Sequence, residues 1–111
     1  MAKQIEIEVV DGIEIVRLSG RLDAKSVEDI KAGMKNLTNA AVALDLTKVN
    51  FVDSSALGLI VSVFRKVQED GGRFCLFGLS AQVSAIFELT RLHRIFDIYA
   101  DQEQAKAALG A

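Results

Sequence analysis

The sequence predicts an α/β fold, a mixed central sheet of about five strands with four helices packed against it. Over the first twenty residues apolar side chains alternate with period two, and later they recur at spacings of three and four, which is the change from strand to helix. Beyond that point short apolar runs alternate with amphipathic stretches, the pattern of parallel strands joined by helical crossovers. We expect the order β-β-α-β-α-β-α-β-α in a single domain, 1–111.

The N-terminal segment predicts a β-hairpin. Isoleucine and valine alternate with glutamate over residues 5–9, as in a strand with one buried face. Asp11 and Gly12 form a strong two-residue turn signal, and apolar residues resume over 13–18. Gly20 is expected to close the hairpin.

An amphipathic helix is predicted after the hairpin. Asp23 or Ser26 can cap its first turn, and the residues 36–39 are expected to end it. Its apolar stripe comprises Val27, Ile30, Met34 and Leu37.

Two further strands flank a second helix. The nearly continuous apolar run 41–46 suits a strand that is covered on both faces. A helix is expected from about residue 53 to residue 70, where Gly71 and Gly72 stop it, and the next strand spans 73–77.

The C-terminal third predicts a helix, a short strand and a last helix. Ser80 can cap the first of these helices, and a strand is expected over 95–98. Asp101 and Gln104 resemble a capping box that opens a helix through Leu109. The buried positions of the helix after Ser80 are expected to be Val83, Ile86 and Phe87.

Composition excludes several classes of protein. Thirteen basic residues against fifteen acidic ones give a net charge of −2, so no overall positive field favours nucleic acid. The one cysteine, Cys75, cannot form an internal disulfide, which suits a reducing cytosol. The longest apolar stretch, 57–64, is far shorter than the ~20 residues that span a bilayer. We expect a cytoplasmic protein with no membrane span and no direct contact with nucleic acid.

Asp53, Ser54 and Ser55 stand where a strand-side loop enters the second helix. Backbone N–H groups at a helix start lack partners, and the helix dipole places partial positive charge there. One of the two hydroxyls can simply cap these groups. A phosphoryl group on serine can also be accommodated at this end of a helix. Spacing alone does not choose between these two roles or between the two serines.

The second helix carries more apolar surface than contact with one sheet requires. The expected core side is formed by Leu57, Ile60, Val61, Phe64 and Val67. Ala56, Leu59 and Val63 fall beyond its edge, near Lys66. These side chains either pack under a neighbouring loop or form a docking strip that runs away from Ser54.

The sequence offers little for catalysis. The only histidine, His93, lies late in the chain and is expected to be a surface residue at a helix end. Neither a Gly-x-Ser-x-Gly elbow nor a Gly-rich phosphate loop occurs. One cysteine and one histidine cannot make a structural zinc site, and Cys75 is expected to be a small buried residue. We therefore expect no enzyme, no cofactor and no metal.

Several segments, in order, resemble the anti-sigma factor antagonists, bacterial members of the STAS domain family. Leu18-Ser-Gly-Arg-Leu-Asp23 is similar to the family's Gly-x-Leu-Asp segment after the opening hairpin. Leu44-Asp-Leu46, Val49 and Phe51-Val-Asp-Ser-Ser-Ala-Leu-Gly58 resemble its signature stretch, although many members have Gly at the position of Ala56. The later matches are Gly71-Gly-Arg-Phe-Cys-Leu76, Phe87-Glu-Leu-Thr-Arg-Leu92 and Ile95-Phe96.

The resemblance implies a phosphorylation switch. In the family the serine directly after the aspartate is phosphorylated, which is Ser54 here. The unphosphorylated antagonist binds an anti-sigma factor that is also its serine kinase, and this releases the sigma factor. A metal-dependent serine phosphatase resets the phosphorylated form, and the free antagonist is usually a monomer. The implied partner-binding residues are Asp23, Asp53, Ser54, Ser55, Leu59, Val63 and Lys66.

Two alternatives stay open. A STAS domain can instead control a non-sigma output such as secretion, biofilm formation, a stressosome-like assembly or a lipid-transport complex. A response-regulator receiver has a similar length and would carry phosphate on Asp53, but it needs an acidic cluster after its first strand, where this chain has its hairpin turn. Retention of Ser54 after Asp53 favours the phosphorylation switch.

Overall fold

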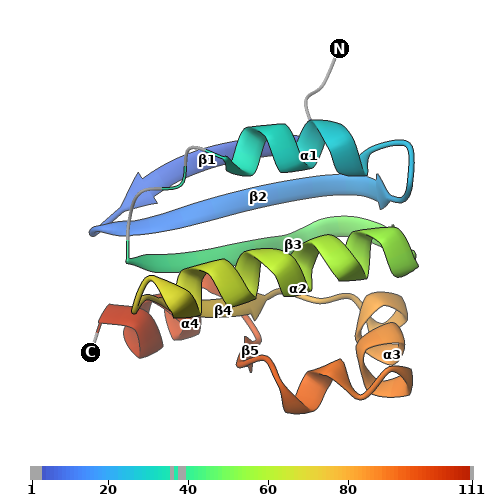
Figure 1. The fold of residues 1–111 in the computed structure, drawn as a ribbon. Coiled ribbons are helices and arrows are strands. Elements are labelled where there is room, and N and C mark those ends of the chain that lie inside the picture. Colours follow the sequence, from blue (N-terminus) through green and yellow to red (C-terminus); the bar gives the residue numbers. More distant parts are fainter. Residues whose placement is uncertain (1–3, 36, 38–39, 111) are drawn as a thin grey trace.

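The computed structural model describes residues 4–35, 37 and 40–110, and its centre is a five-stranded sheet (Figure 1). The strand order follows the sequence, β1-β2-β3-β4-β5. β1 and β2 are antiparallel, and each later neighbour pair is parallel. The predicted mixed sheet is therefore confirmed. The strands are β1 (Ile5–Val10), β2 (Ile13–Leu22), β3 (Ala41–Val52), β4 (Arg73–Phe77) and β5 (Ile98–Tyr99).

Helices cover both faces of this sheet. One apolar cluster joins the sheet to α1, α2 and α3, and a second, smaller cluster joins it to α4. Along β3, Val42 and Leu44 belong to the first cluster and Ala43 belongs to the second. This alternation explains the continuous apolar run of β3, because side chains on both faces are buried. The helices are α1 (Val27–Met34), α2 (Ser54–Glu69), α3 (Ala81–Leu89) and α4 (Gln102–Gly110), with a 3-10 turn, η1 (Leu92–Arg94).

The hairpin forms at the predicted turn but its second strand is longer than expected. Asp11 and Gly12 have φ values of 52° and 79°, and they link Val10 to its partner Ile13. Gly20 does not close β2; it has a φ of 78° and lies at a register shift against β3. A bulge of this kind bends a strand without ending it. β2 therefore continues to Leu22, beside the start of α2.

Strand β3 is also longer than predicted, and α1 is shorter. β3 runs on from 46 to Val52 although Thr47 and Lys48 are exposed, because the extended β2 pairs with it along this length. α1 ends at Met34 rather than including Leu37, which packs against the main core from outside the helix. The predicted terminating residues 36, 38 and 39 lie outside the described part of the chain.

The last short strand exists, but its predicted bounds of 95–98 are wrong. Ile95 closes the 3-10 turn and is 54% exposed, while β5 starts at Ile98 and pairs with β4. Both N-caps predicted in the C-terminal third of the chain form. The Ser80 hydroxyl accepts a hydrogen bond from the Val83 N–H at 3.2 Å, and the Asp101 carboxylate accepts one from the Gln104 N–H at 2.9 Å.

Candidate functional site

Ser54 is the first residue of α2 and its side chain is exposed. Among the described residues the Ser54 hydroxyl has no hydrogen-bond partner, and the same is true of Ser55. The cap is supplied by Asp53, whose Oδ1 accepts a hydrogen bond from the Ala56 N–H at 2.9 Å. The alternative in which a serine hydroxyl caps α2 is therefore wrong. Ser54 is left free for other chemistry.

Asp53 also ties α2 to the loop that follows β2. Its Oδ2 accepts a hydrogen bond from the Ala24 N–H at 3.1 Å, and its N–H donates to the Leu22 carbonyl at 3.0 Å. In the same loop, Asp23 Oδ1 accepts a hydrogen bond from the Lys25 N–H at 3.1 Å. The fold thus brings Asp23, Asp53 and Ser54 to one edge, where parallel β2 and β3 both end.

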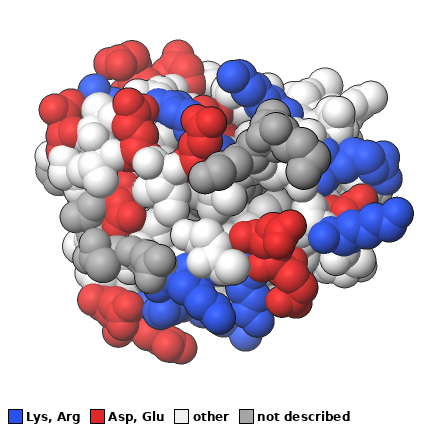
Figure 2. Space-filling view, turned by 90° about the horizontal axis from the view of Figure 1, so that it is seen from above, with Lys and Arg blue, Asp and Glu red and all other residues white. Residues whose placement is uncertain are grey.

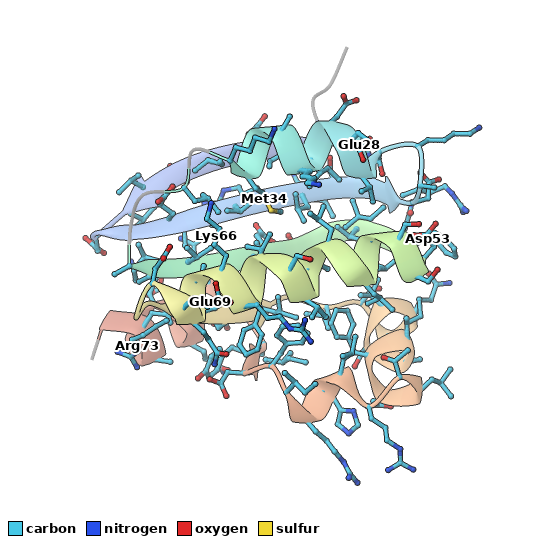
Figure 3. The ribbon with its side chains drawn as sticks, viewed as in Figure 1. Glu28, Met34, Asp53, Lys66, Glu69 and Arg73 are labelled. Atoms are coloured by element: carbon cyan, nitrogen blue, oxygen red, sulfur yellow. The ribbon has the colours of Figure 1, made fainter. Side chains whose placement is uncertain are left out.

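The other predicted contact residues lie along α2. Leu59 and Val63 are half-buried and pack against the main core, whereas Lys66 is exposed. Asp53 and Lys66 lie towards opposite ends of the helix (Figure 3). At 1.5 Å per residue, Lys66 lies about 18 Å along the axis from Ser54. Because Leu59 and Val63 are half-buried, only part of their apolar surface is exposed to a partner.

The predicted division of the faces of α2 is partly wrong. Ala56 was expected beyond the core edge but is 2% exposed, because the first turn of α2 packs directly on the sheet. Val61 and Phe64, expected on the core side, are half-buried and do pack against the main core. The Phe64 ring makes an edge contact with the buried Phe96 ring, with centroids 5.0 Å apart.

Sequence reasoning missed an aromatic contact beside this edge. The guanidinium of Arg21 lies 4.0 Å from the centroid of the Phe51 ring. With Asn50, Gln82 and Ile86 these residues line an open hollow of about 520 Å³. The juxtaposition depends on the register shift after Gly20, which pairs Arg21 with Phe51. Hydrophobic periodicity carries no signal for such a shift.

Two other candidate residues lie outside the site. Cys75 is buried, and burial together with the charge of Asp97 raises the pKa of its thiol to about 12. His93 is exposed in η1, the 3-10 turn after α3, with Nδ1 at 3.3 Å from the Phe87 carbonyl oxygen. Both predictions for these residues are confirmed. Among the described residues, neither side chain forms a hydrogen bond with Ser54.

Surface charge is mixed, and the described helices are short. Acidic and basic side chains are interspersed on the face drawn in Figure 2, and neither sign covers it. Within the described ranges, no group of three or more His, Cys, Asp or Glu side chains is arranged to hold a metal ion. No helix in the described part of the chain is long and apolar enough to cross a bilayer.

The sequence matches known regulatory proteins over nearly its whole length. The STAS domain family matches residues 4–105. The chain is 29% identical to the anti-sigma F factor antagonist of Paenibacillus polymyxa, over 98% of this chain and 97% of the relative. It is 31% identical to the anti-sigma-B factor antagonist of Listeria monocytogenes, over 85% of this chain and 88% of the relative.

The fold matches a solved antagonist in two chemical states. The unphosphorylated form of the anti-sigma factor antagonist SpoIIAA superposes with a TM-score of 0.79 at 26% identity, covering 96% of this chain and 97% of SpoIIAA. The phosphorylated form of SpoIIAA from Bacillus gives a TM-score of 0.73 at 25% identity, covering 94% and 97%. The chain belongs to the STAS domain family, and within that family its sequence and fold place it among the anti-sigma factor antagonists.

Proposed function

We propose that this protein is a phosphorylation-controlled anti-sigma factor antagonist. In its unphosphorylated state it binds an anti-sigma factor that is also its serine kinase, and this binding releases the sigma factor. Phosphorylation of Ser54 blocks the binding. The protein itself regulates and does not catalyse.

The observation that carries this proposal is that the Ser54 hydroxyl is accessible. Its hydroxyl is exposed and has no hydrogen-bond partner among the described residues, so a kinase can reach it without breaking a contact. The backbone N–H groups of Ser54 and Ser55 also lack a protein acceptor in the described part of the chain. They lie at the positive end of α2, where a phosphate dianion is tolerated. The fold can therefore carry the modification without rearrangement.

The same modification opposes partner binding. A phosphoserine adds about −1.5 to −2 charges. Once a partner covers the edge, this charge lies near the carboxylates of Asp53 and Asp23 and loses its contact with water. Repulsion and desolvation then act together, and a penalty of about 3 kcal/mol weakens an affinity more than a hundredfold.

The proposal extends to the partner-binding surface and to the cellular context. Asp23, Asp53, Ser54 and Ser55 form one end of the partner-binding surface, and Leu59, Val63 and Lys66 extend it along α2. A metal-dependent serine phosphatase regenerates the binding form. The free antagonist is a cytoplasmic monomer.

A phosphorylation assay tests the proposal. The chain is incubated with ATP and the small anti-sigma kinases of its own bacterium, and the modified residue is located by mass spectrometry. We expect one kinase to modify Ser54, with no product from Ser54→Ala and a normal product from Ser55→Ala. Labelling of Ser55 alone would move the site by one residue. Labelling of Asp53 by acetyl phosphate, with no kinase product, would contradict the proposal and indicate a receiver.

A further inference from the structure

Helices α1 and α2 lie side by side on one face of the sheet but differ in length (Figure 1). α1 has 8 residues and α2 has 16, so at 1.5 Å per residue they span about 12 and 24 Å. α1 ends at Met34, and the second half of α2 continues beyond it. A cavity of about 170 Å³ lies beside this second half.

The cavity has an apolar interior and a charged edge. Met34 and Val67 are buried, Leu37 and Val63 are half-buried, and all four line it. Two charged side chains, those of Lys66 and Asp70, are exposed and lie at its edge.

Backbone hydrogen bonds hold the surrounding segments in place. The Gly72 N–H donates to the Val67 carbonyl at 2.8 Å, which ties the turn after α2 back to the helix. The Arg73 N–H donates to the Ala40 carbonyl at 2.6 Å, which joins that turn to the segment before β3. Gly72 and Ala40 both line the cavity. These bonds fix the turn after α2 and the segment before β3, which form one side of the cavity.

Lys66 supplies a charge for recognition. Its side chain extends from α2 towards the end of α1, near Met34 (Figure 3). Among the described residues Lys66 forms no ion pair, although Asp70 lies one turn further along the helix. A carboxylate of a partner can therefore pair with this ammonium group beside the apolar interior.

We propose that this cavity receives one apolar side chain of the anti-sigma factor, flanked by an acidic residue that pairs with Lys66. A cavity of about 150 Å³ accommodates benzene, so the observed volume fits one leucine-, methionine- or phenylalanine-sized group. Such buried anchors dominate the binding energy of interfaces. The inference rests on the proposed function, because it names the chemistry of that same partner.

The position of the cavity along α2 favours the anti-sigma factor, rather than a second copy of this chain, as the protein that fills it. The cavity continues the surface that starts at Ser54, about 18 Å away along the helix axis at Lys66. A usual interface of about 800 Å² per partner is close to 30 Å across, so one partner can cover both points.

Two variants and a matched control test this inference by titration with the kinase that modifies Ser54. Val63→Phe fills the cavity, and Lys66→Glu reverses the charge at its edge. Arg65→Glu makes the same charge change at an exposed neighbour that does not line the cavity. We expect Val63→Phe and Lys66→Glu to weaken binding about tenfold or more, and Arg65→Glu to weaken it less than threefold. Thermal melting checks that each variant is folded.

Ser54→Asp, titrated alongside, separates this inference from the proposed function. If Ser54→Asp loses binding while Val63→Phe and Lys66→Glu bind like the wild type, the cavity assignment is overturned and the switch stands. If Ser54→Asp binds normally while both cavity variants weaken binding, the phosphorylation switch is wrong, and the assignment of the cavity to a side chain of the anti-sigma factor stands. A wild-type chain that binds no anti-sigma kinase overturns both. A free-chain dimer that Val63→Phe dissolves would assign the cavity to a second copy and overturn the inference.

Discussion

At the scale of single residues, the site depends on a division of roles between Asp53 and Ser54. Asp53 uses both carboxylate oxygens, one for the Ala56 N–H of α2 and the other for the Ala24 N–H of the neighbouring loop. The Ser54 hydroxyl has no such structural role. A kinase can therefore modify Ser54 while the geometry around it is maintained by Asp53.

Asp53→Ala is expected to lower the free energy of unfolding by about 1 to 2 kcal/mol, because both hydrogen bonds are lost. Urea titration followed by circular dichroism measures the change. Asp53→Asn separates the two bonds, since the asparagine amide oxygen can still cap the helix but its NH2 group cannot accept from the Ala24 N–H, so its loss should lie between those of the wild type and Asp53→Ala. Equal stability of Asp53→Ala and the wild type would show that the hydrogen bonds from Ala56 and Ala24 to Asp53 contribute little to stability.

Cys75 gives a prediction for the effect of pH. Its pKa is raised to about 12 in the folded state, whereas an unfolded thiol ionises near 8.5. The folded state thus keeps a proton that the unfolded state loses, so stability falls as pH rises from about 8.5 towards 12. Urea titrations at pH 8 and pH 10 should show a smaller decrease for Cys75→Ala than for the wild type. Rapid reaction of the native thiol with a disulfide reagent at pH 8 would contradict this account.

At the scale of elements, local pattern predicted most of the fold but not the ends of its strands and helices. The existence and order of the strands and helices follow from the hydrophobic period, and the turn at Asp11 follows from backbone chemistry. The extension of β2 and β3 does not, because exposed residues such as Lys48 are held in strand by pairing with a distant segment. The burial of Ala56 likewise depends on how α2 sits on the sheet.

The candidate site, too, could be predicted from the sequence only where its residues are contiguous. The signature residues around Ser54 are contiguous in sequence, so motif and resemblance identify them together with Asp53. The hollow at Arg21 and the cavity at Met34 each combine segments far apart in the chain. They depend on a register shift and on the difference in length between two helices, which no local pattern encodes.

The turn after β4 offers a test of packing between strands. Gly78 has a φ of 75°, and a Cβ there would lie 2.1 Å from Cγ2 of Thr47, whose hydroxyl donates to Asp45 at 2.7 Å. Gly71 has a φ of 76° with no atom within 4 Å of such a Cβ. Gly71→Ala should therefore lose about 1 kcal/mol from backbone strain alone, and Gly78→Ala clearly more. Equal losses in chemical denaturation would mean that Thr47 moves aside without cost.

At the scale of the whole molecule, the proposed regulation by phosphate would require no second conformation of the antagonist. The site lies at the edge of the sheet, the core continues beneath it, and Ser54 has no contact with that core through its hydroxyl. In the proposed mechanism the change in binding would arise at the surface that meets the partner. Phosphate on Ser54 would add charge to this surface and leave the packing as it is.

Nuclear magnetic resonance can show whether the effect is local. Between wild type and Ser54→Asp, amide shifts should change near residues 22–26 and in the first turn of α2. Amides of α4, on the opposite face of the sheet, should stay unchanged, because that helix belongs to a separate apolar cluster. Shift changes throughout β3 and α4 would indicate a global rearrangement instead.

The most direct test of the account is the affinity of the purified Ser54 variants for the kinase that modifies this residue. Isothermal titration should give wild-type affinity for Ser54→Ala and a loss of about a hundredfold or more for Ser54→Asp, with both variants folded. Ser55→Asp serves as the control for adding one charge at the adjacent exposed serine, and its loss should be smaller. Equal affinities for Ser54→Asp and Ser54→Ala would contradict the claim that charge at Ser54 controls binding.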